Sequence, residues 1–395
     1  MALINKLAAI GDAIRAKTGK ADKLTLDQMP VEIASIETGG GTGGSGESGD
    51  MMVVCEDAGI SPRNILNSIE GLRVSCPNAE VAGDSALRDV TTLISIDLSK
   101  VMYIGVQAFA DCTSLTNINL PLATSIGDSA FDRCTSLTNI NLPLATSIGA
   151  YSFGNCTSLT NADLPNVTTI RSYTFHRCAS LTEINIPKVV TVGENAFANC
   201  TSLTNINLPL ATSIGAYSFG NCTSLTNINL PKCKSIGSAA FSNCIALTNI
   251  DLPVATSVGN RAFLECNALT SIDLPLATSI GDSAFYDTSL DTLILRNSET
   301  VCNLNVTALF GTKILTDEGM PTGEGFVYVP TALYEQYVAS LVEQVMSGGH
   351  DEATAIYLIT SVLRKIEDYP EICGDAYKGA TFVYEETTEP IEGLT

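Results

Sequence analysis

Apolar and polar positions along this chain repeat with a period of 22 residues, far longer than the period of a helix or of a single strand. Leucine opens the units from Leu93 to Leu269 at this spacing, and Leu290 follows after 21 residues. A fixed period of about 20–29 residues with recurring leucine predicts a solenoid, in which each repeat stacks on its neighbours. Phenylalanine marks the same period in nine copies: Phe109, Phe131, Phe153, Phe175, Phe197, Phe219, Phe241, Phe263 and Phe285.

The residues of one unit explain how the period is built. In the unit that opens at Leu115, Leu, Ile and Leu at the first, fourth and sixth positions alternate with Thr and Asn. This alternation predicts a short strand with apolar side chains inward and polar ones outward. Pro121 follows and has no N–H to extend a strand ladder, so it ends the strand. A glycine after the second isoleucine permits a sharp corner, and Arg171 replaces this glycine in one unit.

The repeated pattern Leu-x-x-Ile-x-Leu-Pro-x-x-x-x-Ile-Gly-x-x-Ala-Phe-x-x-Cys resembles the BspA-like (treponemal-type) leucine-rich repeats of bacterial and phage surface proteins. The resemblance covers about residues 93–290, and the unit is one residue shorter than the commonest form of that family. It lacks the asparagine ladder of other leucine-rich repeats. The resemblance implies binding to proteins or glycans, and it implies no reaction. We expect a right-handed, β-rich leucine-rich repeat solenoid of about ten 22-residue units.

Sequences on either side of the repeats predict further parts. We expect a small helical attachment module at residues 1–36 and a Gly/Ser linker at 37–50. An N-terminal cap of the array at 51–92, the solenoid itself at 93–290 and an α+β C-terminal cap at 291–395 should follow. Within the last part, strands are predicted at 293–295 and 326–329, amphipathic helices at 331–346 and 351–367, and a final strand at 381–384. Asp351 is the expected N-cap of the second helix.

An apolar stripe runs along the expected N-terminal helix, residues 2–17, and consists of Leu3, Leu7, Ile10 and Ile14. Such a stripe suits self-association, with a trimer favoured, or docking on another protein. A helix folded back on its own small module fits the same stripe. The segment from Ile4 to Ile33 is similar to the N-terminal module of tail-associated proteins of phages of gut bacteria, which implies attachment to a virion. No basic leader precedes an apolar run, so we expect no secretory signal.

Composition excludes several classes of partner. The chain has 42 acidic and 21 basic residues, a formal net charge of −21, which disfavours nucleic acid and anionic lipid. No apolar run is long enough for a transmembrane helix. Of 13 cysteines, eight stand three residues after a repeat phenylalanine: Cys112, Cys134, Cys156, Cys178, Cys200, Cys222, Cys244 and Cys266. We expect these to be buried, reduced thiols, because stacked side chains point the same way and not at each other.

Motifs for catalysis are missing. The sequence has no Gly-x-Gly-x-x-Gly, Walker A, Gly-x-Ser-x-Gly or His-Glu-x-x-His, so we expect neither an enzyme nor a cofactor. With only His176 and His350 present, no metal site is expected. His176 with Cys178 suggests a cysteine nucleophile, but Cys178 is one of eight equivalent cysteines. An enzymatic site within residues 290–395 remains as an alternative.

Sequence variation is concentrated beside the repeat phenylalanine, where Tyr and Arg, two residues that interfaces favour, recur. The predicted ligand-binding residues are Arg133, Tyr151, Tyr173, His176, Arg177, Tyr217 and Arg261. The alternative is that these are ordinary exposed positions. The sequence thus predicts a non-enzymatic phage tail or fibre protein of the virion, attached to other tail proteins through its N-terminus and recognising a host surface protein or glycan. A bacterial cell-surface adhesin or internalin-like binder is the second hypothesis.

Overall fold

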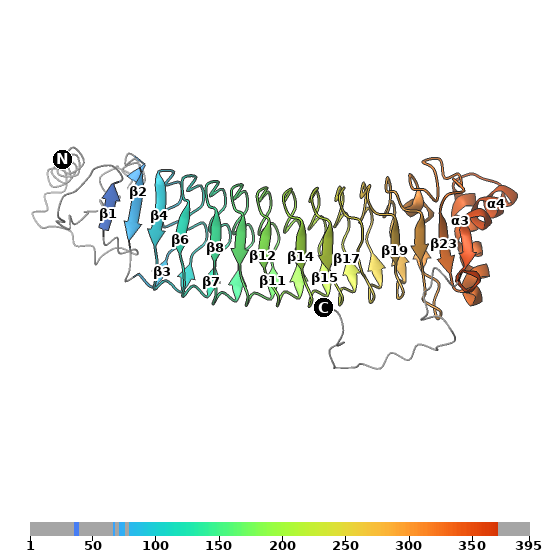
Figure 1. Cartoon of the computed structure of the whole chain (residues 1–395), viewed down its shortest axis with the longest axis horizontal. Coiled ribbons are helices and arrows are strands. Elements are labelled where there is room, and N and C mark those ends of the chain that lie inside the picture. The colour runs from blue at the N-terminus through green and yellow to red at the C-terminus, as the bar shows by residue number, and fades with distance from the viewer. Residues whose placement is uncertain (1–34, 39–65, 68–70, 76–78, 370–395) are drawn as a thin grey trace, which may run out of the picture.

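The computed structural model describes residues 35–38, 66–67, 71–75 and 79–369, and it is an elongated solenoid whose coils stack along one axis (Figure 1). The predicted β-rich leucine-rich repeat fold, with about ten turns some 22 residues apart, is confirmed. The expected N-terminal helix with Leu3, Leu7, Ile10 and Ile14 lies outside the described residues, as do most of the linker and the strand expected at 381–384.

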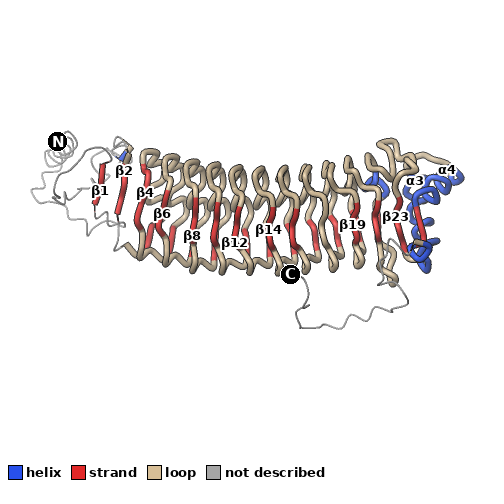
Figure 2. The backbone as a smooth tube through the Cα atoms, viewed as in Figure 1, coloured by secondary structure: helices blue, strands red, loops and turns tan. Residues whose placement is uncertain are grey.

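Two short strands per coil form two rows along the molecule (Figure 2), except that the coil opening at Leu247 has only an isolated bridge, Asn229 to Asp251, in the first row. Strands with the Leu-x-x-Ile-x-Leu pattern form the first row: β2 (Leu72–Ser75), β4 (Leu93–Asp97), β6 (Asn117–Asn119), β8 (Asn139–Asn141), β10 (Asn161–Asp163), β12 (Glu183–Asn185), β14 (Asn205–Asn207), β16 (Asn227–Asn229), β19 (Ser271–Asp273) and β21 (Thr292–Ile294). Pairing is parallel, and partners such as Ile206 and Ile228 are one sequence period apart. One period is therefore one coil.

The second row begins a few residues after the first, and in eight coils a proline stands between the two rows. Its members are β3 (Val81–Ala82), β5 (Tyr103–Ile104), β7 (Ser125–Ile126), β9 (Ser147–Ile148), β11 (Thr169–Ile170), β13 (Thr191–Val192), β15 (Ser213–Ile214), β17 (Ser235–Ile236), β18 (Ser257–Val258), β20 (Ser279–Ile280) and β22 (Asn303–Leu304). The row divides into a four-stranded sheet that ends at β9 and a seven-stranded sheet that begins at β11.

This division coincides with Arg171. At the corner glycines, an added Cβ would come within 2.6 Å of the backbone of the preceding coil, as at Gly127 and Gly215. Gly193 donates its N–H to Ile170 O at 2.7 Å, a bond that crosses between coils. Arg171 carries a Cβ at this corner and lies exposed, and β9 and β11 do not pair there.

The third side of each coil, a turn segment from the corner glycine to the repeat cysteine, pairs with its neighbours without forming a strand. The N–H groups of Ser129, Phe131 and Arg133 donate to carbonyls of the next coil at 2.7–2.8 Å. The N–H groups of the two residues between them donate to carbonyls three residues earlier in the same coil. This alternation needs left-handed backbone twice per coil. Among the described residues, 20 non-glycine residues have positive φ, and all stand two residues before or two residues after the position of the repeat phenylalanine. We name these sets the first and second turn columns.

The core of the solenoid is a stack of identical side chains. Neighbouring phenylalanine rings lie 5.2–5.6 Å apart between centroids and are nearly parallel. Beside them stand the eight cysteines that follow the repeat phenylalanines, here called the ladder cysteines. Each of their thiols donates to a carbonyl of the preceding coil, as Cys134 Sγ does to Phe109 O at 3.1 Å. All eight ladder cysteines are buried and unbridged, as the sequence predicted.

Two helices cover the C-terminal end of the stack, α3 (Tyr334–Ser347) and α4 (Glu352–Val362). The predicted N-cap is confirmed, since Asp351 Oδ1 accepts from Thr354 N at 3.0 Å. The prediction that the second helix runs to residue 367 was wrong. The cap also contains β23 (Phe326–Val329), β24 (Leu363–Lys365) and the 3-10 helices η3 (Val306–Leu309), η4 (Thr331–Leu333) and η5 (Ile366–Asp368).

Sheet pairing explains why α4 ends early. Leu363, Arg364 and Lys365 pair in parallel with Val327, Tyr328 and Val329, so β24 satisfies the backbone groups of β23, the strand that extends the first row beyond β21. Because an open sheet edge exposes unpaired N–H and C=O groups, pairing there outweighs continuation of the helix.

At the other end, β1 (Ser35–Thr38) pairs antiparallel with β2 and covers the first edge of the sheet. This strand crosses the expected boundary between the attachment module, residues 1–36, and the linker, residues 37–50. The domain division as a whole stays a prediction. In the part of the chain that the structure describes, no helix has the length and apolarity to cross a bilayer.

Candidate functional site

Outward side chains along the first strand row bond to the neighbouring coil, either to its backbone carbonyls or to its polar side chains. Thr116 Oγ1 donates to Ile94 O at 3.0 Å, and Thr160 Oγ1 donates to Thr138 O at the same distance. The amide of Asn229 donates to Asn207 Oδ1 at 2.8 Å. These bonds link coil to coil and use donors that a ligand would need. The Thr and Asn face therefore stabilises the stack more than it distinguishes a ligand.

Outward side chains in the turn columns differ from coil to coil. The second column is mostly Asn or Asp, which adopt left-handed backbone more readily than other side chains. Arg133 and Arg177 occupy this column with φ of +59° and +58°. Tyr151 and Tyr173 occupy the first column with φ of +56° and +61°. Left-handed backbone costs such residues roughly 1–2 kcal/mol each.

The two tyrosines form the centre of the candidate site. Their rings stack in parallel, with centroids 4.4 Å apart and an interplanar angle of 4°. Tyr173 also contacts the edge of His176, at 5.4 Å and 74°. Tyr151 is 39% exposed. Partial burial and the neighbouring Tyr173 hydroxyl raise the pKa of Tyr151, so the Tyr151 phenol is a neutral donor at physiological pH.

Asp132, which sequence analysis did not identify, lies beside this stack. Its Oδ1 accepts from Asn155 Nδ2 at 2.9 Å, and an added Cβ on Gly154 would approach the same oxygen within 2.9 Å. Burial raises the pKa of the Asp132 carboxyl, while hydrogen bonding to Asn155 and the charge of Arg133 oppose the rise. The sequence signal for Asp132 was Gly154, which stands one coil later and leaves room for the carboxylate.

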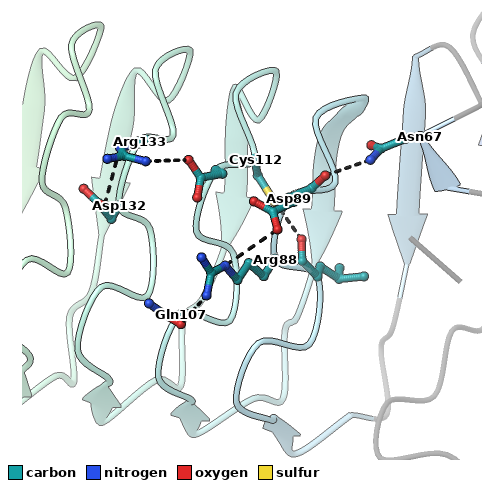
Figure 3. A network of polar contacts seen from close by, with 9 residues as sticks. Asn67, Arg88, Asp89, Gln107, Cys112, Asp132 and Arg133 are labelled. Carbon is teal, nitrogen blue, oxygen red and sulfur yellow. Dashed lines mark hydrogen bonds and ion pairs between the residues drawn. The ribbon is translucent and has the colours of Figure 1, made fainter. Parts of the chain in front are cut away.

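Two guanidinium groups flank the site. Arg133 is 62% exposed and lies 3.4 Å from Asp111 Oδ1 and 3.9 Å from Asp132 Oδ2, measured from Nη1 and Nε (Figure 3). Arg177 is exposed and has no ion-pair partner among the described residues. His176 Nδ1 is buried and has no hydrogen-bond partner within the described part of the chain. Burial and the neighbouring Arg177 lower the pKa of His176, which keeps the imidazole neutral at pH 7.

Five of the seven predicted residues thus lie together in three consecutive coils. We name Arg133, Tyr151, Tyr173, His176 and Arg177, with Asp132 and Asn155 beside them, the turn patch.

Tyr217 and Arg261 share the first turn column but lie apart from the turn patch, with Asn195 and Ala239 at the intervening positions. Tyr217 belongs to the same pentapeptide, Tyr-Ser-Phe-Gly-Asn, as Tyr151. Its ring covers Gly220, where an added Cβ would meet ring atoms at 2.6 Å, and its hydroxyl accepts from Asn221 Nδ2 at 2.6 Å.

Comparison with known families agrees with this architecture. The model of the BspA-type leucine-rich repeat region matches residues 80–203 and 190–308, together more than half of the chain. The chain belongs to the BspA-type leucine-rich repeat family. BspA-type repeat regions form solenoids of binding or structural proteins, and they are not a known enzyme family.

Several solved structures are similar to this BspA-type chain. A leucine-rich cell surface protein from Faecalibacterium prausnitzii is 23% identical, with a TM-score of 0.34 over 57% of this chain and 84% of that one. A leucine-rich repeat protein from Bacteroides ovatus is 22% identical, with a TM-score of 0.37 over 65% and 84%. An internalin from Listeria monocytogenes is 13% identical, with a TM-score of 0.28 over 61% and 84%. No curated protein matches the chain.

Cys178, two residues after His176, is unsuited to nucleophilic chemistry in this BspA-type solenoid. Cys178 is fully buried, and its Sγ donates to Phe153 O at 3.2 Å. Burial raises the pKa of the Cys178 thiol well above its ordinary value. Because the thiolate is the reactive form, this cysteine is a core residue. Among the described residues, no group of three His, Cys, Asp or Glu gathers to hold a metal.

Proposed function

We propose that this BspA-type solenoid is a binding protein, and that the turn patch contacts its ligand. Long Tyr and Arg side chains at left-handed positions carry the proposal. Equivalent positions in adjacent coils hold Ser129, Asn195 and Asn199, which are smaller or suit this backbone better. Arg177 forms no ion pair within the described residues that would explain its presence. Strained positions with exposed aromatic and charged side chains are typical of functional sites.

We place the protein on a bacterial cell surface, which is typical of its family. The partner there is a host surface protein or glycan. The phage tail role depends on the N-terminal resemblance, whose residues lie outside the described part of the chain, and it stays a prediction. In either setting the N-terminal module would attach the protein, to other tail proteins on a virion or to copies of itself, and the solenoid would extend toward the ligand.

Binding of the fluorescently labelled full chain to cultured epithelial cells tests this function. The variant Tyr151→Ser/Tyr173→Asn introduces residues that the same column already contains, so its fold should persist. We expect saturable labelling that this variant loses. Tyr217→Asn is the matched control, because it removes an identical residue outside the turn patch. Equal labelling by all three chains would contradict a role for the turn patch, and the absence of labelling would contradict host-cell binding.

A further inference from the structure

We infer that the turn patch binds an acidic glycan, an inference that rests on the proposed function of the same patch. Charge is the first argument. The chain is strongly acidic, and the solenoid between residues 93 and 290 contains only eight basic residues: Lys100, Arg133, Arg171, Arg177, Lys188, Lys232, Lys234 and Arg261. The patch and its coils contain three of these. In these coils the three arginines balance Asp128, Asp132 and Asp163, so an anionic ligand meets no net negative charge here although the molecule as a whole is strongly acidic.

Both patch arginines are available to a ligand. The ion pairs of Arg133 are long and exposed, and such pairs contribute little stability. Arg133 and Arg177 occupy the same turn column two coils apart, which is about 10 Å at the usual spacing of neighbouring strands. A guanidinium group binds a carboxylate through two parallel hydrogen bonds. The pair can therefore hold two carboxylates on alternate units of one extended polymer.

The groups between the arginines suit a sugar ring. The stacked tyrosines offer flat apolar surface together with hydroxyl groups, the combination that fits the C–H face and the polar edge of a sugar. Asp132 and Asn155 provide oxygens that accept from hydroxyl groups. An acidic sugar carries several hydroxyl donors beside each carboxylate, so one ligand can satisfy these acceptors while its carboxylates bind the arginines. This favours a sugar over a peptide.

Calorimetric titration of the full chain tests the ligand class with two matched pairs of probes. Oligogalacturonate is compared with its methyl-esterified, uncharged form, and sialyllactose is compared with lactose. We expect the chain to bind at least one acidic probe, and to bind it at least about tenfold more tightly than its neutral counterpart, as charge-assisted hydrogen bonds to a carboxylate would provide. Added salt should weaken the binding of the acidic form.

The decisive variant is Arg133→Asn/Arg177→Asn. Asn155 and Asn199 already occupy this turn column, and Asn suits left-handed backbone, so the thermal midpoint should be unchanged or higher. We expect this variant to lose the preference for the acidic probe. Arg261→Asn, the same substitution outside the patch, should bind as the unaltered chain does.

Equal binding of charged and neutral probes, retained binding in the double variant, or no binding of either acidic probe would each overturn the acidic glycan. Cell labelling that depends on Tyr151 and Tyr173 would in those cases still support the proposed function, with a ligand of another class. Loss of both cell labelling and probe binding would overturn the two proposals together.

Discussion

Serine at the position before the repeat phenylalanine places a hydroxyl in the core of the solenoid. Ser152 and Ser218 are fully buried, and their Oγ atoms have no hydrogen-bond partner among the described residues. Other coils have alanine there, as at Ala130 and Ala196, and bury it equally well. A buried hydroxyl without a partner destabilises the folded state, because it loses hydrogen bonds to water.

Ser152→Ala should therefore increase the free energy of unfolding by about 1 kcal/mol. Thr174→Ala is the control at the same column position, because Thr174 Oγ1 donates to Arg171 O at 2.8 Å and its loss removes a bond. Urea unfolding followed by circular dichroism measures both variants. A Ser152→Ala chain less stable than the unaltered one would mean that the hydroxyl has a partner.

His176 should make the stability of the fold depend on pH. Its folded pKa lies below the ordinary value of 6.5. As pH falls through about 6.5, the unfolded chain binds a proton that the folded chain does not, so the free energy of unfolding decreases until the folded pKa is passed. His176→Ala, with the residue found at Ala198, should flatten this dependence between pH 7.5 and 5.5. Identical pH profiles for the two chains would show that His176 titrates normally.

At the scale of elements, the corner between the second-row strand and the turn segment sets how closely coils pack. Gly215 faces the backbone of Gly193 and Glu194, where an added Cβ would lie 2.6–2.7 Å away. Gly83 stands at the same corner of an earlier coil, where an added Cβ would meet no described residue within 4 Å. Glycine is therefore required at this corner in one coil, whereas a larger residue would fit at the same corner of another.

Gly215→Ala should decrease the free energy of unfolding by about 1–3 kcal/mol, because the methyl group forces adjacent coils apart. Gly83→Ala should change it little. Thermal unfolding of the two variants measures the difference, and equal midpoints would contradict the packing argument.

At the scale of the whole molecule, each coil buries its apolar side chains only against its neighbours, so both ends need cover. Helices α3 and α4 cover one end, and β1 pairs with the open edge of β2 at the other. The attachment module expected over residues 1–36 precedes and includes part of β1. A deletion that removes the module but keeps β1 should leave this end of the solenoid covered.

Deleting residues 1–34 should leave a folded solenoid that keeps its ligand binding and loses self-association, if the stripe of Leu3, Leu7, Ile10 and Ile14 forms a trimer as predicted. Light scattering coupled to size-exclusion chromatography measures the oligomeric state. A truncated chain that keeps its oligomeric state would place the association elsewhere, with α3 and α4 as the next surface to test.

Local spacing by itself determined most of the solenoid. The 22-residue period set the coil length, the strand positions and the burial of phenylalanine and cysteine, because each unit repeats the same contacts with its neighbours. Asp351 was predictable as an N-cap because its partner, Thr354, is only three residues away.

Tertiary structure decided what depends on residues one or more coils away. The identical pentapeptides at Tyr151 and Tyr217 place their rings differently, because Tyr173 is available for stacking beside the first and only Asn195 and Ala239 flank the second. Asp132 joined the turn patch because glycine occupies the equivalent position in the next coil. Helix α4 ended at Val362 because the last sheet edge needed a partner strand. Each of these outcomes depends on a neighbour that the local sequence pattern does not contain.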